Sequence, residues 1–178
     1  MSDRWQEARL PDLLAPALDI LFVGINPGRQ SALSGHHFAG PGNAFWRLLL
    51  ESGLTSRLFA PAEDALLPSI GIGVTNIVAR PSRGEGDLSG AELAAGAARV
   101  RERTRALGPR VVALLGRRVA DALAGQRTVG VWGELPVAGL LGRTFVLPNP
   151  SARSTVPYAA RLQAFRAVCC AARAHLDR

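Results

Sequence analysis

Two asparagine–proline pairs stand where short apolar runs of the chain end. The segments are Gly24-Ile-Asn-Pro-Gly28 and Leu147-Pro-Asn-Pro-Ser151. Proline and glycine fix tight turns, so Asn26 and Asn149 would be held in defined positions. An asparagine amide can hold a water molecule or a polar ligand, but it is a poor general base. Taken alone, the first segment is better explained by a turn that only reverses the chain, and the second could be a polar surface turn.

General-base chemistry at such a site needs a carboxylate, which the two amides do not supply. Asp87, with Glu85 as the second choice, lies in a loop at residues 80–88 that follows another apolar run. We hypothesise from this placement that Asp87 assists water activation. The alternative is that Asp87 only caps or charges the N-terminus of the helix that follows.

The first loop also carries an aromatic side chain suited to a planar ligand. Phe38 follows two histidines in a glycine-rich stretch, so its ring could stack on a planar base or tuck into the core. The neighbours His36 and His37 do not easily ligate one metal ion, and no third ligand stands at a recognisable spacing. The only cysteines, Cys169 and Cys170, are adjacent and could not hold an iron–sulfur cluster alone. We therefore expect neither a metal nor a cofactor.

The positive charge is unevenly distributed along the chain. The formal net charge is +7, with about −2 in residues 1–64 and +9 in residues 65–178, and every basic residue is arginine. This asymmetry indicates a polyanionic partner, with nucleic acid as the leading candidate, or alternatively an arginine-rich solvated face. The candidates for phosphate contact are Arg80, Arg83 and Arg153. The arginines expected to form only a solvated helix face are Arg99, Arg101, Arg103 and Arg105.

Short apolar runs alternate with segments of helical spacing. Strands are predicted at residues 19–24, 71–78, 111–115 and 144–147, and helices at 43–52, 89–107, 117–124 and 158–175. Asn43 is able to cap the first of these helices, and Ser89 with Glu92 forms a capping box for the second. This alternation predicts an α/β fold, a three-layer α/β/α sandwich with a central, mainly parallel sheet. Sites form at the carboxyl ends of such strands, so we expect the loops at 25–42, 79–88 and 148–157 to form one site.

The length of 178 residues fits a single domain, with residues 1–17 as an N-terminal lead-in. Hydrophobic residues make up 48% of the chain and charged residues 20%, which excludes a disordered chain. No apolar run approaches the ~20 residues of a membrane span, and the N-terminus lacks the pattern of a signal peptide. We expect a monomeric cytoplasmic protein that does not associate with membranes.

Together the motifs resemble one known family. Gly24-Ile-Asn-Pro-Gly28, with Phe38-Ala-Gly-Pro-Gly-Asn-Ala-Phe-Trp46 close behind, resembles the first motif region of the mismatch-specific uracil-DNA glycosylases. These are relatives of thymine-DNA glycosylase in the uracil-DNA glycosylase superfamily. Gly73-Val-Thr-Asn-Ile-Val-Ala-Arg-Pro81 resembles their middle segment, and Leu147-Pro-Asn-Pro-Ser151 resembles their second motif. The order and spacing match over roughly residues 15–175.

The resemblance implies roles for individual residues. Asn26 would position the water that attacks C1′ of a nucleotide flipped out of the duplex, and Phe38 would stack on the flipped base. Ser31 would lie near the base edge. The whole base pocket would comprise Gly24, Ile25, Ser31, Phe38 and Asn149.

The segment at residues 150–155 would, by the same resemblance, enter the duplex and fill the hole left by the base. Relatives usually carry glycine and then an apolar wedge after Asn-Pro-Ser, whereas Ala152 and Arg153 stand here. Arg153 would therefore intercalate, or instead contact the opposite base or a phosphate. The residues expected to contact DNA are Ser151, Ala152, Arg153, Ser154, Thr155, Arg80 and Arg83.

The leading interpretation is a monofunctional glycosylase that removes uracil from double-stranded DNA, preferentially at U·G mismatches. Lyase chemistry through a lysine Schiff base is excluded because the chain has no lysine. One alternative is a non-catalytic module that binds mismatched or damaged DNA. Another is a small nucleotide-binding α/β protein, although Gly71 and Gly73 lack the third glycine of that fingerprint.

Overall fold

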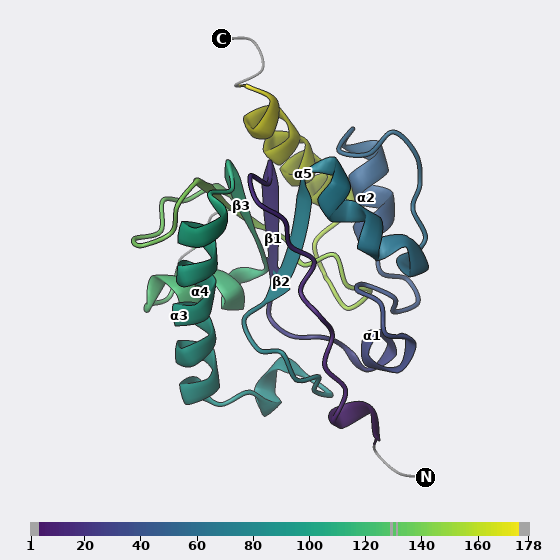
Figure 1. Cartoon of the computed structure of the whole chain (residues 1–178), viewed down its shortest axis with the longest axis vertical. Coiled ribbons are helices and arrows are strands. Elements are labelled where there is room, and N and C mark those ends of the chain that lie inside the picture. The colour runs from purple at the N-terminus through teal and green to yellow at the C-terminus, as the bar shows by residue number, and fades with distance from the viewer. Residues whose placement is uncertain (1–3, 129, 131, 175–178) are drawn as a thin grey trace.

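A five-stranded sheet forms the centre of the computed structural model, which describes residues 4–128, 130 and 132–174 (Figure 1). The strands are β1 (Ile20–Gly24), β2 (Ile72–Asn76), β3 (Val111–Leu115), β4 (Gly133–Glu134) and β5 (Arg143–Leu147). Their order is β2-β1-β3-β5-β4, and all neighbours pair in parallel except the antiparallel β4 and β5. The predicted α/β fold with a mainly parallel sheet is therefore confirmed.

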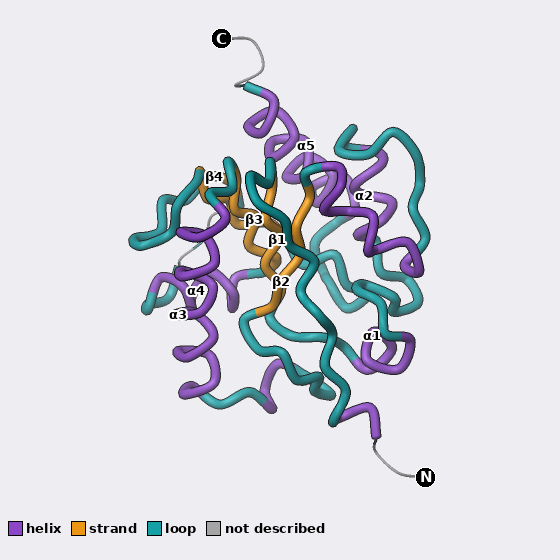
Figure 2. The backbone as a smooth tube through the Cα atoms, in the orientation of Figure 1, coloured by secondary structure: helices purple, strands orange, loops and turns teal. Residues whose placement is uncertain are grey.

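Helices cover both faces of the sheet, which makes the three layers visible in Figures 1 and 2. One face packs against α3 (Gly90–Leu107) and α4 (Arg117–Ala124), and the other against α2 (Phe45–Glu51) and α5 (Tyr158–Arg173). Successive strand residues point to opposite faces, so Phe22 joins one cluster while Leu21 and Val23 join the other. Because both faces are covered, these strands are apolar runs rather than alternating ones.

Helix α3 begins and ends where its sequence predicts. The Ser89 hydroxyl accepts a hydrogen bond from the Glu92 N–H at 3.2 Å, and the Glu92 carboxylate accepts one from the Ser89 N–H at 2.9 Å. The helix closes at Gly108, whose φ of +57° favours glycine. Helix α2 begins two residues later than predicted, but the Asn43 side chain still accepts a hydrogen bond from the Phe45 N–H at 3.0 Å.

Four short helices and one strand were not predicted from the sequence. Short helices occupy Arg29–Ser34 (α1), Pro61–Ile70 (η2), Glu85–Asp87 (η3) and Arg4–Gln6 (η1), and the first of them lies inside the loop predicted at 25–42. Strand β4 has only two residues, too few to produce a periodic pattern. The predicted helix at 158–175 ends at Arg173 in α5, and position 175 lies outside the described residues.

The lead-in at residues 4–18 packs onto the domain instead of standing apart from it. Trp5, Leu10 and Leu13 are buried, and Leu13 forms an antiparallel bridge with Val74 at the outer edge of β2. The Leu13 N–H donates to the Val74 carbonyl at 2.9 Å, and the Val74 N–H donates to the Leu13 carbonyl at 2.8 Å. No helix among the described residues is long and apolar enough to cross a membrane.

Gly96 marks a close approach between α3 and the end of β2. A Cβ at this position would lie 2.0 Å from the Ile77 carbonyl oxygen. We expect Gly96→Ala to lower the free energy of unfolding by about 1–3 kcal/mol, because the helix must move away from the sheet. Urea unfolding of the purified protein measures this change.

Gly90 provides the matched control in the same helix, because a Cβ there meets nothing within 4 Å. We expect Gly90→Ala to leave stability unchanged or to raise it slightly. Equal stabilities of the two variants would contradict the close packing of α3 on the sheet.

Candidate functional site

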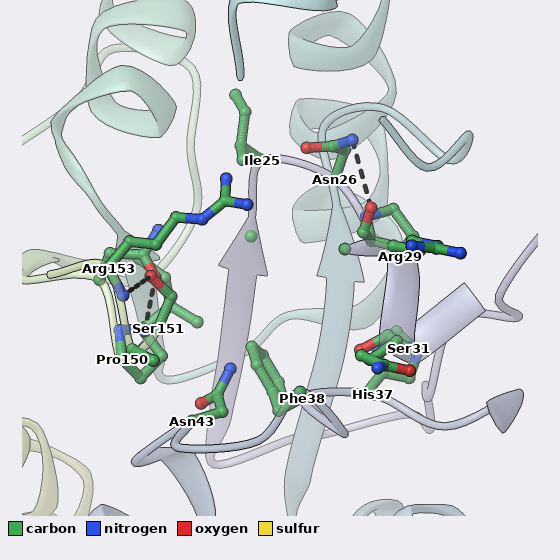
Figure 3. Close-up of a pocket in the computed structure, with 18 of the residues that line it drawn as sticks. Ile25, Asn26, Arg29, Ser31, His37, Phe38, Asn43, Pro150, Ser151 and Arg153 are labelled. Atoms are coloured by element: carbon green, nitrogen blue, oxygen red, sulfur yellow. Dashed lines mark hydrogen bonds between the residues drawn. The ribbon is translucent and has the colours of Figure 1, made fainter. Parts of the chain in front are cut away.

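A cavity of about 690 Å³ opens at the carboxyl ends of the parallel strands (Figure 3). The three loops singled out from the sequence converge on it, and the lining includes residues 24–31, 37–38, 40–41, 43, 82–85 and 149–154. Leu10 of the lead-in, Asn76 at the end of β2 and Leu115 at the end of β3 complete the lining. The three loops therefore come together around one cavity, as expected from their positions at the strand ends.

The Asn26 side chain is held in a single orientation. Its amide nitrogen donates to the Arg80 carbonyl at 3.2 Å, to the Ser82 hydroxyl at 2.9 Å and to the Pro27 carbonyl at 3.3 Å. Two of these partners are carbonyls, which only accept, so the nitrogen must face them. The amide oxygen is left as an acceptor at the cavity, where it can hold a water molecule through one of the water's protons.

Two other asparagines are fixed the opposite way round. The Asn43 side-chain oxygen accepts from the Phe45 N–H at 3.0 Å, and that of Asn149 accepts from the Ser151 N–H at 2.9 Å. Each oxygen is thus held by the backbone, and the amide nitrogen remains a potential donor. The lining therefore includes one amide whose oxygen is a potential acceptor and two whose nitrogens are potential donors, a set that could bind a ligand bearing carbonyl oxygens.

The Phe38 ring packs against the core and also lines the cavity. It stacks on Phe45 with centroids 3.8 Å apart and an interplanar angle of 21°. The ring is therefore in contact with the core, as one sequence interpretation expects, and it borders the cavity, where the other interpretation expects a stacked base. The backbone φ of Phe38 is +52°, which costs a non-glycine residue of order 1–3 kcal/mol, so the surrounding contacts must hold it there.

The residues around Phe38 are tied to three distant segments. The buried Ser31 hydroxyl accepts from the Ala39 N–H at 3.2 Å. Both His36 and His37 contact Asp64, and Nε2 of His37 donates to the Pro11 carbonyl at 2.8 Å. Within the described part of the chain, no group of three or more His, Cys, Asp or Glu side chains could hold a metal ion.

Several lining residues were not identified from the sequence as site residues. Among them are the polar residues Asn43, Asn76 and Ser82. Asn76 ends β2 in register with Gly24 on β1, and a Cβ on Gly24 would lie 2.5 Å from the Asn76 side-chain oxygen. A polar residue ending the strand beside the one that carries Asn26 was the available signal. Ser82 carried no such signal, because its role depends on a contact between two loops.

Arg80 was predicted to contact phosphate, but its guanidinium binds groups within the protein. Its guanidinium donates to the Glu92 carboxylate at 2.6 and 3.0 Å and to the Asp87 carbonyl at 2.9 Å, and it is absent from the cavity lining. The bonds from Arg80, followed by those from the Ser89 N–H and hydroxyl, lower the pKa of Glu92 to about 2. Arg80 thus anchors the loop whose carbonyl orients Asn26.

Asp87 does not line the cavity either. Its carboxylate accepts from the Arg83 N–H at 3.1 Å and from the Gly84 N–H at 3.2 Å, which caps the short η3 turn. These contacts favour the capping alternative over water activation, although the turn it caps precedes the predicted helix. Among the described residues, Glu85 is the one carboxylate that borders the cavity.

The mouth of the cavity is bridged by Arg153. Its guanidinium donates to the Arg83 carbonyl at 3.2 Å, and its N–H donates to the Ser151 hydroxyl at 3.3 Å. Figure 3 shows the guanidinium extending away from the turn at residues 150–154. Ala152 and Ser154 also line the cavity on this side. The segment expected to enter a duplex therefore stands at the rim of the cavity.

A second cavity of about 650 Å³ adjoins the first along the same turn, and Thr155 lies in it. It shares Glu85, Leu115, Asn149, Arg153 and Ser154 with the first cavity. Its own lining includes Arg117, Arg118, Arg127 and Trp132, and the Arg117 guanidinium lies 4.7 Å from the Trp132 ring centre. The arginines of this lining outnumber its carboxylates, Glu85 and Asp121, so the second cavity is net positive, which suits a polyanionic partner.

The arginines of α3 are more than a solvated face, so that prediction is wrong for most of them. The guanidinium of Arg99 donates to the Ile77 carbonyl at 3.1 Å, and that of Arg101 donates to the Leu123 carbonyl. Arg103 donates to the Thr75 hydroxyl at 2.9 Å and pairs with Asp12. Long arginine stems can cross a helix surface and reach carbonyls of neighbouring elements, which periodicity does not show.

Comparison with known families agrees with this geometry. A family model described as the uracil DNA glycosylase superfamily matches residues 11–173. The match includes every strand of the sheet and all three loops around the cavity.

The ion pair of Glu92 with Arg80 leads to a prediction about acid stability. The pKa of Glu92 falls from its ordinary 4.5 to about 2 in the folded protein, so its stabilising effect is complete above pH 4.5 and is lost as pH falls through about 2. We expect Glu92→Gln to be less stable than the wild type at pH 7. Denaturant unfolding at pH 7, 4 and 3 should show this difference shrinking.

Glu102 on the exposed side of the same helix supplies the control. Glu102→Gln removes one carboxylate without touching the Arg80 loop, so its stability should track that of the wild type across the same pH range. A stability gap for Glu92→Gln that does not depend on pH would refute the assigned ion pair.

Proposed function

The chain belongs to the uracil DNA glycosylase superfamily, and from this membership we propose that it excises uracil preferentially at U·G mismatches. Membership in the superfamily establishes the general activity: DNA glycosylases hydrolyse N-glycosyl bonds in base excision repair. The preference for a mismatch, the flipping of the base and the individual residue roles are our proposal. The observation that carries the proposal is the fixed orientation of Asn26, whose oxygen faces the cavity.

In the proposed complex the uracil leaves the base stack and enters the larger cavity. One face of the base lies on Phe38, whose other face is already supported by Phe45. The amide nitrogens of Asn43 and Asn149 donate to the carbonyl oxygens of the base. Negative charge develops on uracil as the N-glycosyl bond breaks, so prearranged donors stabilise the transition state more than the ground state.

Asn26 supplies the position of the attacking water. The sugar develops oxocarbenium character as the base departs, so the nucleophile can be a water molecule that is well placed rather than strongly activated. The Asn26 oxygen accepts a hydrogen bond from that water and leaves one of the water's lone pairs directed at C1′. As the C1′–O bond forms and the N-glycosyl bond breaks, the proton that the water loses passes to the departing uracil anion or to bulk water. The sequence suggested instead that Asp87 activates the attacking water. The single-turnover rate of Asp87→Asn tests that role: an unchanged rate in a folded protein leaves Asp87 with capping alone.

Two features support a preference for U·G over U·A. Removing a base from the stack costs a few kcal/mol and costs least at a mismatched pair. Arg153 stands on the turn proposed to enter the duplex, and arginine is the side chain that most often pairs with guanine edges. The positive lining of the second cavity would hold the DNA backbone next to this turn.

Removal of the Asn26 amide should abolish most of the catalysis. We expect Asn26→Ala to lower the single-turnover rate of uracil release from a U·G duplex by about 100-fold, because the water is no longer held in line with C1′. The assay uses excess protein with EDTA, a labelled duplex and alkaline cleavage of abasic sites. Parallel U·A and single-stranded substrates should react more slowly than U·G.

Three outcomes bear on the proposal. A wild-type rate for Asn26→Ala contradicts its role in positioning water. Equal rates on U·G and U·A contradict the mismatch preference. A folded wild-type protein that binds the U·G duplex but releases no uracil supports the non-catalytic binding module instead.

Contact between Arg153 and DNA should appear in the salt dependence of binding. We expect Arg153→Ala to bind a U·G duplex more weakly and, if its contact is a phosphate, to reduce the slope of log Kd against log salt by about 1. Fluorescence anisotropy between 50 and 300 mM NaCl measures the slope.

Arg105→Ala is the matched control, because Arg105 is exposed in the last turn of α3 and lines neither cavity. It removes the same charge, so an equal effect of both substitutions would assign the change to net charge alone. Weaker binding by Arg153→Ala with an unchanged slope would assign Arg153 to a base contact, and unchanged affinity would exclude a DNA contact.

A further inference from the structure

Asp64 is a buried carboxylate to which the proposed chemistry assigns no role. It lies on η2, is only 5% exposed and does not line the cavity. Burying a carboxylate is costly unless hydrogen bonds compensate for the lost water. Its partners therefore show what the buried charge does in this fold.

Both carboxylate oxygens of Asp64 point to the turn that precedes Phe38. One accepts from the His37 N–H at 2.8 Å, and the other lies 3.1 Å from Nδ1 of His36. The neighbouring Glu63 behaves differently, because it accepts from the Ala60 N–H at 2.8 Å and pairs with Arg57. Glu63 thus caps its own helix, whereas Asp64 reaches across to another loop.

The turn held by Asp64 contains the strained backbone of the site. Phe38 has a φ of +52°, a conformation that a phenylalanine adopts only when its neighbours impose it. Asp64 fixes the two residues before it, and Ser31 fixes the residue after it through the Ala39 N–H. The ring is consequently held 3.8 Å from Phe45 with its other face toward the cavity.

We infer that Asp64 is a positioning residue for catalysis, which holds Phe38 as a preformed stacking platform for the flipped base. The inference rests on the proposed function, because it requires that Phe38 contacts the base. Without the Asp64 contacts, the turn can relax to a negative φ and the ring can leave its position over the cavity. The flipped base would then lack the Phe38 ring on which it stacks.

The test is a double-mutant cycle between Asp64→Ala and Phe38→Leu. Each single substitution should lower the single-turnover rate on a U·G duplex by about tenfold, the scale of one lost base–aromatic stack. The double variant should react no more slowly than Phe38→Leu, because Asp64 acts through Phe38. Effects that multiply, or a wild-type rate for Asp64→Ala, would overturn the inference.

Further measurements separate positioning from general stability. Affinity for a duplex carrying a tetrahydrofuran abasic analogue should not change in Asp64→Ala, because that ligand has no base to stack. Asp64→Asn keeps an oxygen that accepts from the His37 N–H, so it should restore most of the rate. A rate for Asp64→Asn as low as that of Asp64→Ala, or weaker binding of the abasic duplex by Asp64→Ala, counts against positioning.

Two controls complete the design. Glu63→Ala disturbs the same helix without touching the turn and should keep the wild-type rate, whereas an equal loss would assign the effect to the helix. If Asp64→Ala does not fold, Asp64→Ser replaces it in the cycle, because its shorter side chain cannot reach both partners. A wild-type rate for Phe38→Leu would remove stacking from the proposed function, whereas a slow Phe38→Leu beside a fast Asp64→Ala would reject only the role of Asp64.

Discussion

The orientation of one amide determines what the cavity can do. Asn26 leaves β1 on a turn, and its nitrogen is engaged by groups of the loop that follows β2. This contact joins two neighbouring parallel strands at their carboxyl ends, so the sheet itself sets the distance between the partners. If the amide were reversed, its oxygen would face two carbonyls and the cavity would lose its acceptor for water. The Arg80–Glu92 pair and the cap from Asp87 keep the second loop in place for this contact.

An aromatic column connects the site to the core. The rings of Phe22 on β1 and Phe45 pack edge to face with their centroids 5.3 Å apart, and Phe45 in turn stacks on Phe38 at the cavity. Phe165 of α5 stacks on Phe22 from the same face of the sheet. A platform built on such close-packed rings has few alternative positions, so a base that stacks on it meets a surface that is already ordered. The strain at Phe38 is tolerated because contacts from several segments hold the turn.

The arginines near the cavity fall into two groups, those that bind other groups of the protein and those that stand at the rim. Some arginines are structural: Arg99 and Arg101 of α3 donate to the carbonyls of Ile77, just after β2, and Leu123 of α4, and Arg80 pairs with Glu92. Others stand at the rim, where Arg153, Arg117 and Arg127 face the side on which the second cavity opens. Net charge alone does not separate these groups, because an arginine that crosses a helix and one that faces solvent contribute equally to the sum.

Local sequence patterns predicted four of the five strands, the helices α2 to α5 that cover the sheet and the edge where the loops meet. Apolar runs, the Ser89 capping box and the two Asn-Pro turns are local signals, and each depends on residues close together in the chain. The direction in which each amide points, the contact of Phe38 with both the core and the cavity, and the reach of Asp64 to the turn before Phe38 became visible only in the folded chain. These features are contacts between residues far apart in sequence, such as Asn26 with Ser82 and His37 with Asp64. The same limit explains why Asp87 was a candidate site residue while Asn43, Asn76 and Ser82 were not: a carboxylate in a loop is visible in the sequence, but the direction of hydrogen bonds between loops is not.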